Sequence, residues 1–228
     1  VTLMMMKTEG HKVASTSRTA IQGLLQGFSY LKNQRSISAV ILLGVTMGLF
    51  GSSFDTLLPV FADEIYETGL DVGGRLLLGA GIGGLIATTA ITLIGKRVRP
   101  ALYLLIAGLG LGSAQLIFSR IDVIAVAVIV AGFIGGFKVV LGTMNTTVVQ
   151  TLVDEEFRGR VMSINQLTWG ASALGGLLMG YMAERFDAPT AMTLGGAIAI
   201  LATILVGQRL VRSFGIGSKP RQEYDSTD

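Results

Sequence analysis

The chain has 228 residues, of which 50% are hydrophobic and 14% are charged, and its mean hydropathy is +0.63; soluble domains carry about 25% charged residues, so an ordinary soluble domain is excluded. The net charge of +3 is typical of basic cytoplasmic loops in a membrane protein, and no aromatic and basic residues interleave in a way that indicates nucleic-acid binding. With no cysteine and one histidine, His11, the chain cannot build a disulfide framework or a thiolate or multi-histidine metal site, and we expect no cofactor.

Residues 1–36 are predicted to form a cytoplasmic leader that contains a surface helix. From Thr19 to Asn33, apolar residues recur at helical spacing within a polar and basic segment. This pattern predicts an amphipathic helix that lies in the plane of the membrane surface. The apolar positions are Ile21, Leu24, Leu25, Phe28 and Leu31.

Apolar runs separated by short charged segments follow the leader. Runs of roughly twenty residues match the ~30 Å hydrocarbon core of a bilayer. The sequence therefore predicts an all-α, polytopic membrane protein with a six-helix transmembrane domain over residues 37–212 and a disordered cytoplasmic tail over residues 213–228. The predicted spans are residues 37–61, 72–95, 101–118, 123–150, 161–183 and 190–210.

The distribution of lysine and arginine predicts the orientation of these spans. If the leader is cytoplasmic, most basic residues outside the spans fall on the cytoplasmic side, and the outer loops hold only Arg120 and Arg185. Basic residues concentrate in the cytoplasmic loops of membrane proteins. We therefore expect both termini to be cytoplasmic.

The chain contains 31 glycines, many of them four residues apart within the predicted spans. Such pairs remove side-chain bulk from one helix face, so that two backbones can approach closely. They serve either static packing or a sliding surface for rocking motions. The pairs are Gly79/Gly83, Gly108/Gly112, Gly132/Gly136 and Gly176/Gly180.

Two opposite charges lie near the outer ends of the first two spans. Asp55 is in the outer third of the first span, where Pro59 frees the carbonyl of Asp55 from its helical bond. Arg75 lies at a similar depth in the second span. The two residues form either a structural ion pair or a proton-coupling site, because burial disfavours the charged form of a carboxyl group.

Lys138 lies within the fourth span, with about ten apolar residues on either side. A lysine near the middle of a bilayer costs several kcal/mol unless it is paired or hydrated. Gly142 and Asn145 share its helix face, at i+4 and i+7, which predicts the wall of a water-filled cavity. The alternative is a side chain that reaches toward the membrane surface.

Two charged clusters lie on the predicted cytoplasmic side. The acids at the start of the fifth span either complement the positive end of that helix or form a gate with the basic cluster between the second and third spans. The first cluster is Asp154, Glu155, Glu156, Arg158 and Arg160, and the second is Lys96, Arg97 and Arg99. Trp169, deeper in the fifth span, faces either the cavity, where an aromatic ring suits a bulky substrate, or lipid and neighbouring helices.

Two segments resemble a known family of transporters. Residues 150–163, Gln-Thr-Leu-Val-Asp-Glu-Glu-Phe-Arg-Gly-Arg-Val-Met-Ser, resemble the loop between the tenth and eleventh helices of major facilitator superfamily transporters, with the nearest likeness to the drug and siderophore exporters. Residues 26–33 resemble the surface helix before the seventh helix of these exporters. Residues 95–99 resemble a degenerate copy of the superfamily's Gly-x-x-x-Asp-Arg-x-Gly-Arg-Arg loop, without its aspartate.

The resemblance covers about residues 19–212 and implies the C-terminal half of an exporter, helices seven to twelve. It implies proton-driven export of a siderophore or a drug by alternating access, in the inner membrane of a bacterium, and no enzyme activity. The partners are then the lipid bilayer, the small organic substrate, protons, and an N-terminal six-helix half or a second copy. The alternative is a membrane scaffold or regulatory subunit that does not transport.

Overall fold

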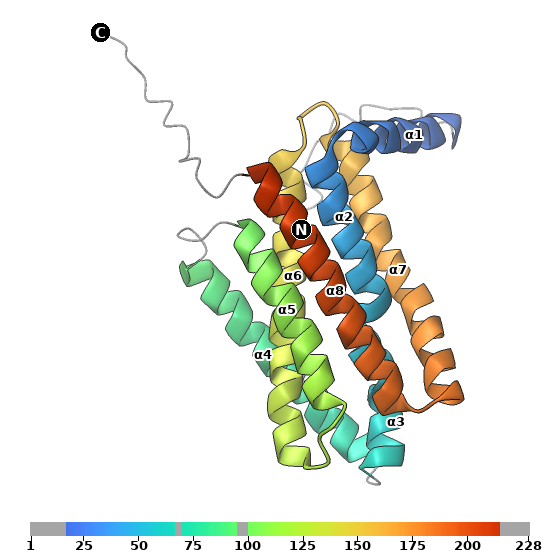
Figure 1. Cartoon of the computed structure of the whole chain (residues 1–228), viewed down its shortest axis with the longest axis vertical. Helices are drawn as coiled ribbons and strands as arrows, with labels where there is room; N and C mark the ends of the chain where they lie inside the picture. Colours follow the sequence, from blue (N-terminus) through green and yellow to red (C-terminus); the bar gives the residue numbers. More distant parts are fainter. Residues whose placement is uncertain (1–16, 67–69, 95–99, 215–228) are drawn as a thin grey trace, which may run out of the picture.

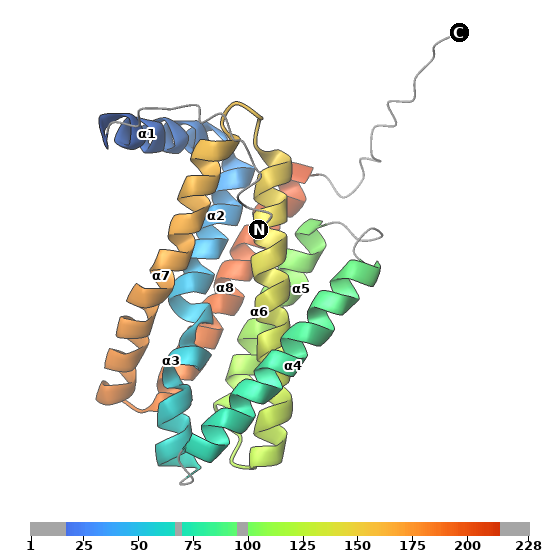
Figure 2. The same cartoon turned by 180° about the vertical axis from the view of Figure 1, so that it is seen from behind.

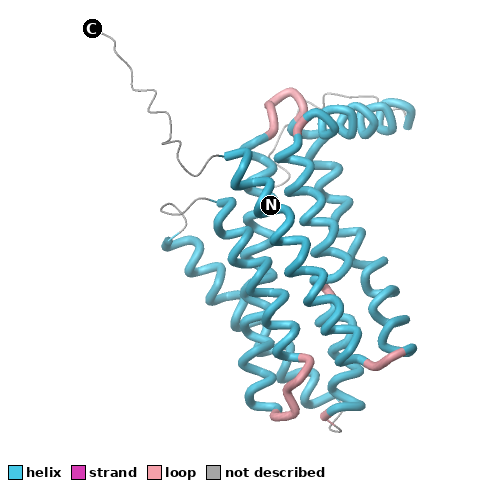
Figure 3. Tube along the Cα trace, in the orientation of Figure 1, coloured by secondary structure: helices cyan, strands magenta, loops and turns pink. Residues whose placement is uncertain are grey.

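The computed structural model describes residues 17–66, 70–94 and 100–214, and these residues form helices joined by short connections, with no strand among them (Figure 3). The all-α class is therefore confirmed. The elements are α1 (Ser17–Asn33), α2 (Arg35–Thr46), η2 (Met47–Gly51), α3 (Ser53–Val60), η3 (Phe61–Ile65), α4 (Leu70–Ile94), α5 (Pro100–Phe118), α6 (Ile124–Leu152), α7 (Arg158–Arg185) and α8 (Ala188–Phe214).

The long helices lie side by side, and α1 lies across one end of the bundle, next to the loop between α6 and α7 (Figure 1). Helices α5 and α8 pack together on one face. Seen from behind, α4 crosses α6 obliquely, and α7 runs beside α2 (Figure 2). The helix predicted over residues 19–33 is thus present as α1. The predicted tail lies outside the described residues, apart from residues 213–214, which belong to α8.

Five stretches are long and apolar enough to cross a membrane among the described residues: 35–65, 71–93, 101–118, 124–152 and 188–209. Large apolar side chains cover their outer surfaces; on α4, for example, Leu85 is 72% exposed. Such a surface suits lipid and is unusual for a soluble monomer. The remaining predicted span, the fifth, over residues 161–183, lies in α7, which has the length but is less apolar, and it buries the polar residues Asn165 and Thr168 inside the bundle.

The first span is a broken helix. Its α-helical turns give way to a π-helical segment, η2, and Ser52 then leaves helical geometry at φ −87° and ψ 6°. The Gln115 side chain of α5 donates a hydrogen bond to the Gly51 carbonyl at 2.9 Å, and the Ser53 hydroxyl donates to the Phe50 carbonyl at 2.5 Å. The main break therefore precedes Pro59, and a second π-helical segment, η3, follows that proline.

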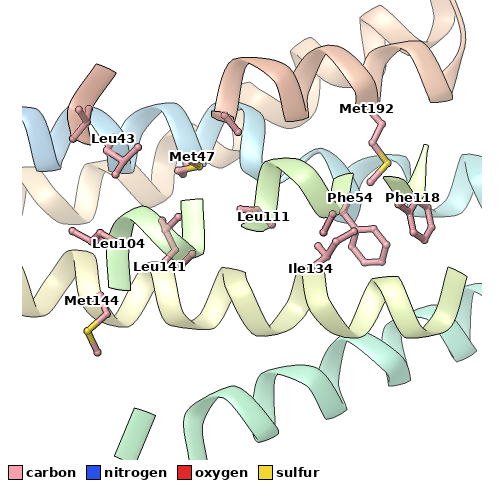
Figure 4. Packing of buried hydrophobic residues seen from close by; sticks show 14 of the residues in the cluster. Leu43, Met47, Phe54, Leu104, Leu111, Phe118, Ile134, Leu141, Met144 and Met192 are labelled. Atoms are coloured by element: carbon pink, nitrogen blue, oxygen red, sulfur yellow. The ribbon is translucent and has the colours of Figure 1, made fainter. Parts of the chain in front are cut away.

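The core lies between α2, α3, α5, α6 and α8, where large apolar side chains interdigitate (Figure 4). Phe118 of α5 meets Phe54 and Phe61 of the broken span in edge-to-face contacts, with ring centroids 5.2 Å apart in both pairs. Such aromatic pairs contribute about 0.5–1.5 kcal/mol beyond the area they bury. The aromatic cluster thus anchors the C-terminal half of the first span against α5.

Glycines bring α4 and α6 into backbone contact. A Cβ atom added to Gly79 would lie 2.5 Å from the Val128 carbonyl oxygen, and one added to Gly83 would collide with the Gly132 carbonyl. On α5, a Cβ atom at Gly112 would lie 2.7 Å from the Gly196 carbonyl oxygen of α8. These predicted pairs therefore serve close packing. A Cβ atom at Gly180 would meet nothing within 4 Å.

The α4–α6 contact can be tested with two alanine substitutions on the same helix. We expect Gly83→Ala to lower the free energy of unfolding by about 1–3 kcal/mol, because the new methyl group overpacks a backbone contact. Gly81→Ala is the matched control, since its methyl group meets nothing within 4 Å, and it should leave stability unchanged or raise it by up to about 1 kcal/mol. Thermal unfolding in detergent micelles measures both. Equal effects of the two substitutions would contradict the packing role.

Candidate functional site

An ion pair between two helices that are far apart in the sequence marks the candidate site. The ammonium of Lys138 on α6 donates a hydrogen bond to Oδ2 of Asp55 on α3. The two side chains keep 37% and 47% of their surface exposed, so the pair is open to one side. A lysine at this depth is tolerated because the aspartate compensates its charge.

The pair lies in a groove of about 820 Å³ between α3, α4 and α6. Small and polar residues form much of its wall, since a larger side chain on α4 or α6 would fill it. The lining residues are Phe54, Asp55, Ala80, Gly81, Gly84, Leu85, Thr88, Ile134, Gly135, Lys138, Val139, Gly142, Thr143, Thr146 and Thr147.

The structure does not bring Asp55 to Arg75. The Arg75 guanidinium lies 3.8 Å from the Asp71 carboxylate, one turn earlier on α4, and these side chains are 65% and 88% exposed. The i,i+4 spacing on one helix places Arg75 and Asp71 on the same face. Asp55 faces α6 instead, so its partner is Lys138. The prediction that Asp55 pairs with Arg75 is therefore wrong.

A second cavity, of about 70 Å³, lies on the other side of Lys138, against the break in the first span. Lys138 and Gly142 line both spaces, so the lysine stands at their junction. The break exposes small residues here, and α7 closes the opposite wall. The other lining residues are Gly44, Met47, Gly48, Gly51, Ser52, Leu111, Leu141, Asn145, Thr168 and Ser172.

Asn145 lines this smaller cavity but does not line the groove. Its side chain is 5% exposed and donates a hydrogen bond to the Val40 carbonyl of α2 at 2.9 Å. Gly44 leaves room for it, because a Cβ atom there would lie 3.1 Å from the Asn145 amide nitrogen. Asn145 is therefore first of all a tie between α6 and α2.

Sequence reasoning missed the threonines of the groove. Thr143, Thr146 and Thr147 extend the polar face of α6 beyond Lys138, and Thr88 faces them from α4. The signal was present, because threonines recur at helical spacing from Thr143 onward. Trp169 belongs to α7, and the position of its side chain lies outside the described structure.

The acidic loop between α6 and α7 contacts α1. The Tyr30 hydroxyl donates a hydrogen bond to the Asp154 carboxylate at 2.9 Å, and its ring stacks on Phe157 at 4.5 Å between centroids. The Arg160 guanidinium lies 5.5 Å from the centre of the Phe157 ring. Desolvation by burial, together with the charge of Asp154, raises the pKa of Tyr30, so its hydroxyl keeps its proton and remains a donor.

The other members of the two charged clusters are placed only in part. Glu155 lies 3.6 Å from Arg158 on the same turn, and both are exposed, as is Glu156. Lys96, Arg97 and Arg99 lie outside the described residues. The structure thus places Asp154 against α1 and leaves the predicted contact between the two clusters undescribed.

Comparison with known proteins gives one family and several distant relatives. The family described as "Transmembrane secretion effector" matches residues 1–226. The chain is 27% identical over 157 residues to the "Staphyloferrin A transporter" of Staphylococcus aureus, covering 68% of this chain and 39% of that protein. It is 24% identical over 207 residues to the "Multidrug efflux pump Tap" of Mycobacterium tuberculosis, covering 90% and 49%.

The pump of the same name from Mycolicibacterium fortuitum is 23% identical over 210 residues, covering 90% of this chain and 50% of that pump. The chain therefore spans about half the length, or less, of these curated relatives. No solved structure matches it.

The contact between Tyr30 and Asp154 can be tested by hydrogen exchange. Tyr30→Phe removes the hydroxyl and keeps the ring on Phe157, so we expect a loss of about 1 kcal/mol of local stability. Amides of residues 154–157 should then exchange about fivefold faster. Tyr103→Phe on α5 makes the same chemical change away from the loop and serves as the control. Unchanged exchange in the Tyr30 variant would show that the bond does not hold the loop.

Proposed function

Because this chain belongs to the transmembrane secretion effector family of the major facilitator superfamily, we propose that it is one half of an exporter of small organic molecules. The curated relatives of the chain are named as transporters and efflux pumps. The chain matches about half of each of those pumps. The other half of the exporter is an N-terminal six-helix half or a second copy of this chain. The cargo is a siderophore or a drug, the two classes that the names of the relatives suggest.

The observation that carries the proposal is the Asp55–Lys138 pair in its groove. Intramembrane charges are costly and face the bundle interior or a water-filled cavity in transporters. Here the two charges come from different helices and stay partly exposed, which suits a pair that opens during a cycle. We propose that this groove is the half of the substrate site that this chain contributes, with Asn145 and Trp169 as further members of the cavity.

Proton coupling is proposed to act through Asp55. When the pair opens in the outward-facing state, Asp55 can take up a proton, which removes the charge that Lys138 compensates. Release of that proton on the inner side restores the pair. The alternating access of two halves around a site near the midplane supplies the change in exposure. A pair that never opens would be structural instead, and Asp55 would stay charged throughout.

We propose a charge-based gate at the end of the bundle that carries α1. Its acidic side is the loop from Asp154 to Glu156, and its basic side is the cluster of Lys96, Arg97 and Arg99, with Arg158 and Arg160 beside the acids. Exposed pairs contribute only about 0–1 kcal/mol each. A small bias is enough, because ~1.4 kcal/mol changes a two-state population about tenfold.

The proposed orientation has both termini in the cytoplasm of a bacterial cell, with η3 outside and the α6–α7 loop inside. The chain has no native cysteine, so single cysteines report their side of the membrane without background. We expect Glu64→Cys to react with an impermeant thiol reagent on intact cells, and Glu156→Cys to react only after permeabilisation. Both positions are exposed. The opposite labelling pattern would invert the orientation.

Coupling can be tested in membrane vesicles that contain the complete transporter. We expect Asp55→Asn to abolish substrate-driven proton flux, because the amide cannot exchange a proton. Arg75→Gln removes a charge from an exposed i,i+4 pair outside the groove and serves as the control, with flux near that of the unmodified protein. Retained flux in a well-folded Asp55→Asn protein would remove Asp55 from the coupling mechanism. Absence of transport in the unmodified protein would favour the membrane scaffold instead.

A further inference from the structure

We propose that Lys138 is a built-in competitor: its ammonium occupies Asp55 until an exported molecule with a charged amine displaces it. This inference rests on the proposed function, since it names the chemical class of the molecule that the groove accepts. It assigns a specificity role to Lys138 that differs from direct contact with the exported molecule.

The charges of the groove support a site for one amine. Among the described residues that line it, Asp55 and Lys138 are the ionisable ones, and they neutralise each other. A ligand can therefore gain an ionic contact only by replacing one member of the pair. An ammonium replaces Lys138 at Asp55, whereas an anion replaces Asp55 at Lys138.

The threonines of the groove favour the first exchange. The hydroxyl of Thr88 donates to the Gly84 carbonyl at 2.9 Å, and that of Thr147 donates to the Thr143 carbonyl at 2.8 Å. Because a hydroxyl has a single hydrogen, the oxygens of Thr88 and Thr147 are left as acceptors. Acceptors that share the groove with a carboxylate suit a ligand that donates several hydrogen bonds, as an ammonium does.

The two members of the pair also differ in their freedom to move. Lysine carries its ammonium on a long, flexible stem, whereas the aspartate carboxylate is held close to the backbone of α3. Lys138 lines the smaller cavity as well as the groove, while Asp55 lines the groove but not the smaller cavity. The ammonium can thus leave Asp55 and enter the smaller cavity, whereas the carboxylate does not border it.

The smaller cavity can receive that ammonium. Its volume of about 70 Å³ exceeds the ≈ 30 Å³ that one water occupies in the liquid. Ser52 and Asn145 line it, and the Asn145 amide nitrogen is already engaged at Val40, which leaves the amide oxygen to accept. A displaced Lys138 therefore keeps polar contacts, and the exchange does not strand a buried charge.

The test uses two fluorescent ligands with the same apolar part and opposite charge, 1-pyrenebutylamine and 1-pyrenebutyrate. Their binding is measured on the purified full chain in lipid nanodiscs. Lys138→Met removes the competitor, and we expect it to bind the amine about tenfold more tightly than the unmodified chain, a change of ~1.4 kcal/mol. Asp55→Asn should lose saturable binding of the amine. Arg75→Met removes a positive charge outside the groove and should change neither ligand's affinity.

A second variant keeps the proposal testable if Lys138→Met does not fold. Lys138→Arg keeps the charge, and arginine holds a carboxylate more firmly through its planar fork of donors, so amine binding should be weaker than in the unmodified chain. Affinity for the amine should be highest with methionine at position 138, lower with lysine and lowest with arginine. Equal affinities, a reversed order, or saturable binding of pyrenebutyrate but not the amine by the unmodified chain would overturn the proposal.

This experiment separates the inference from the proposed function because it requires no transport. If the affinities follow the expected order but the complete transporter moves no substrate, export is refuted and the competitor role of Lys138 stands. If proton-coupled transport depends on Asp55 but the affinities do not follow that order, export stands and the competitor role is overturned.

Discussion

Backbone N–H and C=O groups inside a bilayer have no water to bind, so every interruption of a membrane helix must find partners within the protein. The first span meets this constraint at Gly51 and Ser52, where the α5 side chain Gln115 donates a hydrogen bond to the buried carbonyl of Gly51. The break and α5 therefore depend on each other. The smaller cavity lies against the same break, and Lys138 forms part of its wall. The break that Gln115 stabilises therefore also forms the smaller cavity beside the charged pair.

The groove has a similar origin in the absence of side chains. Helices α4 and α6 touch through glycine backbones at Gly83 and Gly132, and Gly135 makes a further close contact with the Ala80 carbonyl, while Gly81 lines the groove with nothing within 4 Å of an added Cβ atom. The same residues that let the helices approach therefore leave the volume in which Asp55 and Lys138 meet. Close packing and an open polar surface occur side by side because glycine permits both.

Much of this arrangement could be predicted from the sequence, and the exceptions have physical reasons. The number of long helices, the amphipathic helix α1 and the close glycine contacts follow from local periodicity, which can be read directly from the sequence. The partner of Asp55 does not, because depth along one helix says little about which face meets another helix. The π-helical segment η2 adds to the difficulty, since it changes the rotation of α3 relative to α2. Asn145 shares a helical stripe with Lys138, yet its amide is used at Val40, a contact that spacing alone does not reveal.

The closest contacts among the helices group them into two bodies, which one apolar core joins. Helix α7 interlocks with the first span: a Cβ atom on Gly48 would lie 2.5 Å from the Thr168 carbonyl oxygen, and one on Gly175 would collide with Leu49. Helices α4 and α5 pack on α6 instead, and α8 touches members of both groups. Asp55 belongs to the first body and Lys138 to the second, whereas the other ion pairs of the described chain lie within one helix or its adjoining loop. The Asp55–Lys138 pair is therefore an ion pair that joins the two bodies, alongside the aromatic contacts of Phe118 and the Gln115 hydrogen bond, and any relative movement of the two bodies must stretch it.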